Sequence, residues 1–62
     1  MSAEESLKRA EELMDRLEQA RARLEATSDP DAAIEVLTEL AEIAREVEAA
    51  LSQAKREADA EA

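Results

Sequence analysis

Apolar residues recur at alternating spacings of three and four along the first 26 positions of the chain. A seven-residue repeat of this kind is typical of a helix that buries one narrow stripe. Ser2 and Glu5 have the spacing of a capping box, which marks the start of a helix. The pattern predicts a first helix over about residues 3–26, with a stripe made of Ala3, Ser6, Ala10, Leu13, Leu17, Ala20 and Leu24. Ser6, its polar member, either tunes the helix register or lies near a frayed end.

The repeat stops at a short polar segment, residues 27–30, which holds the only proline of the chain. Asp29 suits the N-cap of a second helix, and Pro30 suits its first turn, where the missing N–H is not needed. Pro30 also disfavours helical backbone at Asp29. We therefore expect a tight turn between two helices, and neither one continuous helix nor a long linker.

A second repeat follows and predicts a helix over about residues 30–58. Its predicted stripe consists of Ala33, Leu37, Leu40, Ala44, Val47, Leu51, Ala54 and Ala58. Further apolar residues flank this stripe on both sides: Val36, Ile43 and Ala50 on one, Ile34 and Ala41 on the other. A helix with a single neighbour needs a narrower stripe, so the second helix is expected to have two or more neighbours. Residues 53–62 lack large apolar side chains, and we expect this end to fray.

These patterns predict an all-α fold, in which residues 1–62 form one antiparallel two-helix hairpin. A chain of 62 residues without cysteine buries little surface and has no disulfide to stabilise it. The hairpin is therefore expected to complete a four-helix bundle, by self-association or with a partner. The predicted hairpin seam is Ala10, Leu13, Leu17, Ala20, Leu24, Ala33, Leu37, Leu40, Ala44, Val47, Leu51 and Ala54. The predicted oligomer or partner interface is Leu7, Met14, Ile34, Val36, Ala41, Ile43 and Ala50.

The charge of the chain narrows the choice of partners. Seventeen acidic residues against eight basic ones give a net charge of −9, which argues against direct binding of nucleic acid or anionic lipid. The chain has no aromatic residue to stack on bases, and no apolar run approaches the ~18 residues of a membrane span. Its first residues have no apolar core of a signal peptide. We expect a soluble, cytoplasmic protein with no membrane partner.

Few residues are candidates for chemistry. Without cysteine or histidine, the common transition-metal ligands are missing, and the carboxylates mostly occupy outward-facing positions. Glu48, beside the predicted second stripe, is more simply a partner for a lysine or arginine at an interface edge. The chain has no glycine-rich phosphate loop, and its serines and threonines have no base nearby. We expect no enzyme, no catalytic or metal-binding residue and no cofactor.

Arg9, Arg16 and Arg23 recur every seven residues on one edge of the first helix. They could follow a phosphate backbone, or they could pair with glutamates of a neighbouring helix, such as Glu48 or Glu57. The acidic net charge favours the second interpretation.

Two resemblances bear on the role of the chain. Its plan is similar to the plasmid-encoded repressor-of-primer dimer, although the basic, aromatic RNA-binding face of that family has no counterpart here. Residues 10–58 resemble the small subunit of exodeoxyribonuclease VII, through Ala10-Glu11-Glu12, Leu24-Glu25, Pro30 and the segment from Leu51 to Ala54. Ala10 and the pair Ala20-Arg21 stand where that family has an aromatic residue and an Ile-Val pair. The second resemblance implies a non-catalytic subunit that packs on helices of a large nuclease subunit.

The absence of glycine suggests an idealised sequence, because average usage would give several. A designed helical hairpin is therefore as compatible with the sequence as a natural subunit. The leading hypothesis is a non-enzymatic, self-associating hairpin, with a dimer favoured. The alternatives are a non-catalytic small subunit of an exodeoxyribonuclease VII-like nuclease and a helical adaptor for another partner. The number of copies and the orientation of two hairpins stay open at this point.

Overall fold

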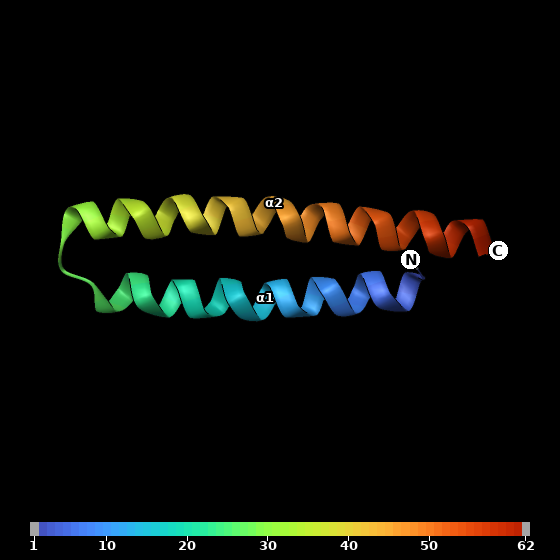
Figure 1. The fold of residues 1–62 in the computed structure, drawn as a ribbon, viewed down its shortest axis with the longest axis horizontal. Coiled ribbons are helices and arrows are strands. Elements are labelled where there is room, and N and C mark those ends of the chain that lie inside the picture. Colours follow the sequence, from blue (N-terminus) through green and yellow to red (C-terminus); the bar gives the residue numbers. More distant parts are fainter. Residues whose placement is uncertain (1, 62) are drawn as a thin grey trace.

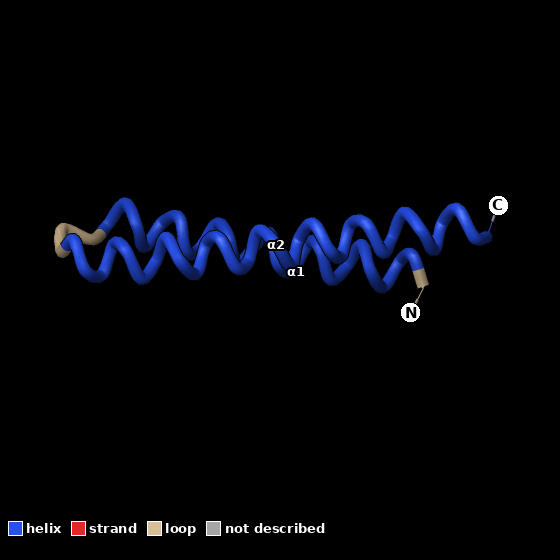
Figure 2. Tube along the Cα trace, turned by 90° about the horizontal axis from the view of Figure 1, so that it is seen from above, coloured by secondary structure: helices blue, strands red, loops and turns tan. Residues whose placement is uncertain are grey.

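The computed structural model describes residues 2–61 and shows two antiparallel helices joined by a tight turn (Figure 1). Helix α1 spans Ala3–Ala26 and helix α2 spans Pro30–Glu61, so α2 extends beyond its predicted end near residue 58. The two helices lie against each other along a molecule 49 Å long, and the last turns of α2 project beyond the start of α1 (Figure 2). No strand occurs within the described residues. The predicted all-α hairpin is confirmed.

The start of α1 is fixed by Ser2, whose Oγ accepts a hydrogen bond from the backbone N–H of Glu5 at 3.2 Å. The Ser2 hydroxyl in turn donates to Glu5 Oε1 at 3.3 Å. This arrangement differs from a full capping box, in which the glutamate accepts from the backbone N–H of the cap. It still satisfies one of the free amides of the first turn and begins the helix at Ala3.

The turn needs no glycine because every described residue keeps a negative φ. At the end of α1, Thr27 is extended, with φ −91° and ψ 141°, and its N–H donates to the carbonyl oxygens of Arg23 and Leu24. Asp29 Oδ1 then accepts from the N–H of Asp31 at 3.2 Å, and Pro30 is the first residue of α2. This confirms the predicted helix start at Pro30. The chain therefore reverses direction within three residues.

The face of α1 that packs on α2 is the predicted one. Leu13 is 1 % exposed, and Ala10 and Ala20 are buried beside it. Leu17 and Leu24 are half-buried along the same line, with Leu17 packed against the core cluster. The seven-residue repeat therefore identifies the buried face of α1 correctly.

In α2 the seam lies on a face rotated from the predicted one. Four positions of the predicted stripe do belong to the seam: Ala33, Leu40, Val47 and Ala54 are all buried or half-buried. Between them, however, the structure places Val36, Ile43 and Ala50, which the pattern assigns to the outer interface. Ile43 is only 1 % exposed, and Ala50 is buried.

The residues predicted for these intervening positions, Leu37, Ala44 and Leu51, are exposed instead. Leu37 is 51 % exposed and Leu51 45 %. This rotation of α2 buries Ile43 and brings Glu39 and Glu46 beside arginines of α1. A seam through Leu37 would have placed the row of Ile43 against those arginines.

The open end of the hairpin carries a polar contact within the seam. Ser6 is 1 % exposed, and its Oγ donates to Glu57 Oε1 at 2.7 Å. Glu57 Oε2 is buried and accepts no hydrogen bond from the described residues. Ser6 is therefore an ordered part of the seam, and the interpretation that it lies at a frayed end is wrong.

Candidate functional site

The large hydrophobic side chains that the fold leaves exposed share one property: each directly follows a residue of the seam. They are between 45 and 61 % exposed, and they are Leu7 and Met14 on α1 and Ile34, Leu37 and Leu51 on α2. Their seam neighbours are, in the same order, Ser6, Leu13, Ala33, Val36 and Ala50.

This common position places them on one side of the hairpin. A step of one residue turns a helix by 100° in a fixed sense. Since α1 and α2 run in opposite directions with their seams facing each other, the same step points to the same side on both. The exposed Ala41 and Ala44 also follow seam residues of α2 and lie among these side chains. We call this surface the apolar face: Leu7, Met14, Ile34, Leu37, Ala41, Ala44 and Leu51.

The apolar face contains only part of the predicted interface. Leu7, Met14, Ile34 and Ala41 belong to it, whereas Val36, Ile43 and Ala50 are in the hairpin seam. Leu37, Ala44 and Leu51 join the face although the pattern assigns them to the seam. The sequence does hold the missing signal: Glu39 and Glu46 are seven residues apart, as are Arg16 and Arg23. The observed rotation of α2 brings these two rows together.

The opposite side of the hairpin carries residues that precede seam positions, and they are mostly charged. Arg16 lies 3.7 Å from Glu46, and Arg23 donates to Glu39 at 2.8 Å, both across the two helices. The prediction that the three arginines pair with glutamates of the neighbouring helix is confirmed for Arg16 and Arg23, although with other partners than Glu48 or Glu57. We call this side the charged face.

The next arginine in the row, Arg9, has no such carboxylate opposite it. It lines a shallow pocket of about 240 Å³ together with Glu46 and Gln53, and Gln53 lies one heptad beyond Glu46. The pocket is open and only partly apolar. Gln53 stands at the position where a glutamate would continue the row of Glu39 and Glu46. Within the described residues, the ion pairs of the charged face therefore lie between Arg16 and the turn, and they do not extend to Arg9.

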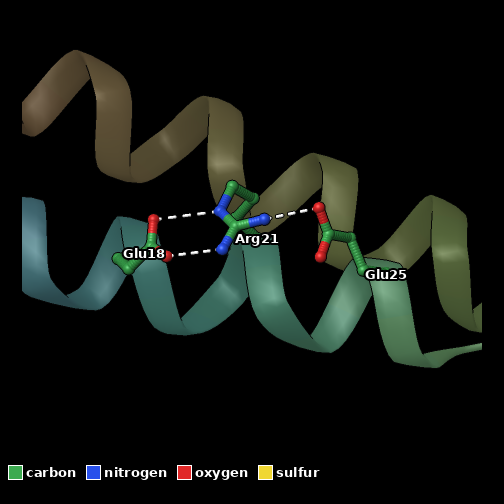
Figure 3. Close-up of polar contacts among 3 residues, drawn as sticks. All are labelled: Glu18, Arg21 and Glu25. Atoms are coloured by element: carbon green, nitrogen blue, oxygen red, sulfur yellow. Dashed lines mark hydrogen bonds and ion pairs between the residues drawn. The ribbon is translucent and has the colours of Figure 1, made fainter.

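An ion-pair cluster lies beside the apolar face, at the turn end of α1 (Figure 3). Arg21 donates through Nε and one terminal nitrogen to Glu18, and through the other to Glu25, at 2.5 to 2.9 Å. The hydrogen bond from Arg21 lowers the pKa of the Glu18 carboxyl below its usual value. The two glutamates raise the pKa of Arg21. All three side chains are about half exposed or more, so the cluster contributes little to stability by itself.

Three observations concern metal binding, membrane insertion and the carboxylate of Glu48. Between residues 2 and 61, no three acidic side chains come together in a way that could hold a metal ion. Neither α1 nor α2 has a stretch apolar enough to cross a membrane. Glu48, the carboxylate that the sequence singles out, is exposed on α2, on the same side as the apolar face. The arrangement is suited to helix packing through the apolar face.

Comparisons with protein families, with curated proteins and with solved structures find no match for this chain. The resemblance to the exodeoxyribonuclease VII small subunit therefore stays a prediction.

Proposed function

We propose that this chain is a non-enzymatic helical hairpin that works by self-association, with two copies packing their apolar faces together into a four-helix bundle. The observation that carries the proposal is the position of the five exposed large hydrophobic side chains, all on one side of the hairpin. Scattered exposed hydrophobic residues are ordinary on a protein surface, but a patch confined to one side marks an interface. The opposite side carries mostly charged residues and two ion pairs between the helices.

The size of the hairpin supports a second copy as the occupant. Its accessible surface is 4626 Å², and an ordinary interface covers about 800 Å² on each partner, roughly a sixth of that surface. One long side of a 49 Å molecule is large enough. A single hairpin of 62 residues, whose seam is partly alanine, has only a small core. Packing on a second copy would bury more apolar surface and so stabilise the hairpin.

The amino-acid composition bears on the cellular compartment in which the protein works. Disulfides form in oxidising compartments, and this chain has no cysteine to form one. Its acidic net charge disfavours binding to nucleic acid and to anionic membranes. Both features support a cytoplasmic protein. The absence of glycine and the regular repeat fit a designed sequence as well as a natural one.

A matched pair of substitutions tests the proposal. Ala44 lies in the apolar face, and Ala49 is an exposed alanine of the same helix on the charged side. We expect the wild-type chain to sediment at equilibrium as a dimer. Ala44→Glu should abolish the dimer because it buries a carboxylate at the centre of the interface, whereas Ala49→Glu, the same chemical change, should leave it intact.

Other outcomes contradict the proposal in different ways. A monomeric wild-type chain that becomes helical only when a second protein is added would favour the accessory-subunit alternative. A dimer that survives Ala44→Glu but not Ala49→Glu would place the interface on the charged face.

A further inference from the structure

The charges around the apolar face decide how a second copy is oriented on it. This step rests on the proposed self-association. A two-fold axis can place the second hairpin in two ways, and in both every helix has antiparallel neighbours. With both turns at the same end, α1 lies on α2 of the second copy. With the turns at opposite ends, α1 lies on the other α1, and α2 on the other α2.

The half of this side that α1 supplies is strongly acidic. Besides Leu7 and Met14, the residues that follow its seam positions are Glu4, Glu11, Glu18, Arg21 and Glu25. The one arginine among them is already bound by Glu18 and Glu25. Stacking α1 on another α1 would bring four glutamates of each copy together. Like charges across an interface oppose association, so the arrangement with opposite ends is disfavoured.

The half that α2 supplies is close to neutral and has basic residues at its edge. Glu48 and Lys55 follow seam positions, and Arg45 lies next to Ala44 on the outer edge of the face. Arg45 makes no ion pair within residues 2–61. This half therefore offers a cation that the hairpin itself does not use.

The levels of these charges along the bundle also match. The ion pairs Arg16–Glu46 and Arg23–Glu39 show which residues of α1 and α2 lie at the same height. By the same relation Glu18 is level with Ala44, one residue before Arg45, and Glu4 is level with Ala58, three residues beyond Lys55. A two-fold axis parallel to the helices preserves these levels between copies. We infer that two copies associate with their turns at the same end, each α1 lying on α2 of the other copy, with Glu18 beside Arg45.

Distances between spin labels distinguish the two orientations. The chain has no cysteine, so Ser28→Cys labels the exposed turn and Asp59→Cys labels the open end, one at a time. With the turns at the same end, adjacent helices are about 10 Å apart, and both labels should give distances below roughly 30 Å. With opposite ends, the separation for Ser28→Cys approaches the 49 Å length of the molecule.

The same experiment separates the two proposals. If no dipolar coupling appears and the labelled chain sediments as a monomer, the self-association itself is wrong. If the coupling appears with a long distance at either label, the dimer stands and the orientation is wrong.

A charge reversal gives an independent check. Arg45→Glu and Arg56→Glu make the same change in net charge on the same helix, but only Arg45 borders the apolar face, since Arg56 precedes a seam residue. Because each dimer contains two Glu18–Arg45 contacts, Arg45→Glu should weaken the dimer about fivefold more than Arg56→Glu does. Equal weakening by both variants would contradict the orientation.

Discussion

At the residue scale, the most unusual contact is the buried hydrogen bond between Ser6 and Glu57. The seam elsewhere is apolar, so this bond is the one polar layer between the helices that the described residues show. A buried polar pair contributes little net stability, but it penalises any shift of one helix along the other, because both partners would lose their bond. We therefore expect Ser6 and Glu57 to help set the register of the two helices at the open end of the hairpin.

Substitution of Ser6 tests this assignment. Ser6→Ala should lower the free energy of unfolding by about 1–3 kcal/mol, because the Glu57 carboxylate stays partly buried with one hydrogen bond fewer. Ser52→Ala is the matched control: Ser52 is exposed on α2, so its change should stay within about 0.5 kcal/mol. Urea unfolding followed by circular dichroism at one protein concentration measures both. Equal effects of the two substitutions would contradict a structural role for the bond. Adding Glu57→Leu to Ser6→Ala should recover most of the loss.

At the element scale, the two helices differ in how well the sequence specifies their buried face. In α1 the arginine row borders one edge of the apolar stripe, and Leu7 and Met14 are the only large apolar residues beside the other edge, so the repeat identifies one seam. In α2 the apolar residues cover a wider arc, and rows such as Val36–Ile43 and Leu37–Leu51 have similar size and hydrophobicity. Periodicity within α2 cannot choose between such rows. The two rows differ in the charges beside them: with Ile43 in the seam, Glu39 and Glu46 lie beside the arginines of α1.

A disulfide across the seam tests which face of α2 packs on α1. Ala10 and Ala50 are both buried in the same cluster, so Ala10→Cys with Ala50→Cys should form an intramolecular disulfide. Closing a loop of this length should raise the free energy of unfolding by about 2–4 kcal/mol. Ala10→Cys with Leu51→Cys is the control and should stay reduced, since Leu51 is exposed on the apolar face. Thiol counting by mass spectrometry reads out both pairs. If the cysteines at positions 10 and 51 oxidised readily and those at positions 10 and 50 did not, the seam predicted from the sequence, which runs through Leu51, would be correct.

At the scale of the whole molecule, the hairpin is well specified by sequence and the assembly is not. Pro30, the cap at Asp29 and the seven-residue repeats are local features, and together they give the helices and the turn as the structure shows them. The face that meets a second copy depends on what is left after the hairpin has formed. The apolar periodicity leaves two rows of α2 as candidates for this face, and the burial of Ile43 and the exposure of Leu37 separate them.

Net charge governs how readily two copies meet. Each chain carries −9, and it is only 14 by 12 Å across, so a dimer concentrates charge along its whole length. The Debye length falls from about 30 Å at 0.01 M salt to about 8 Å at 0.15 M, so added salt removes most of the repulsion between the two chains. The free energy gained by burying the apolar face stays almost unchanged. We expect the dimer dissociation constant at pH 7 to fall severalfold over this range, measured by sedimentation equilibrium in sodium chloride. Near pH 4.3, where the net charge of the chain is close to zero, the same salt change should have little effect. Dissociation promoted by salt at pH 7 would instead show that ion pairs between the copies, and not the apolar face, hold the dimer together.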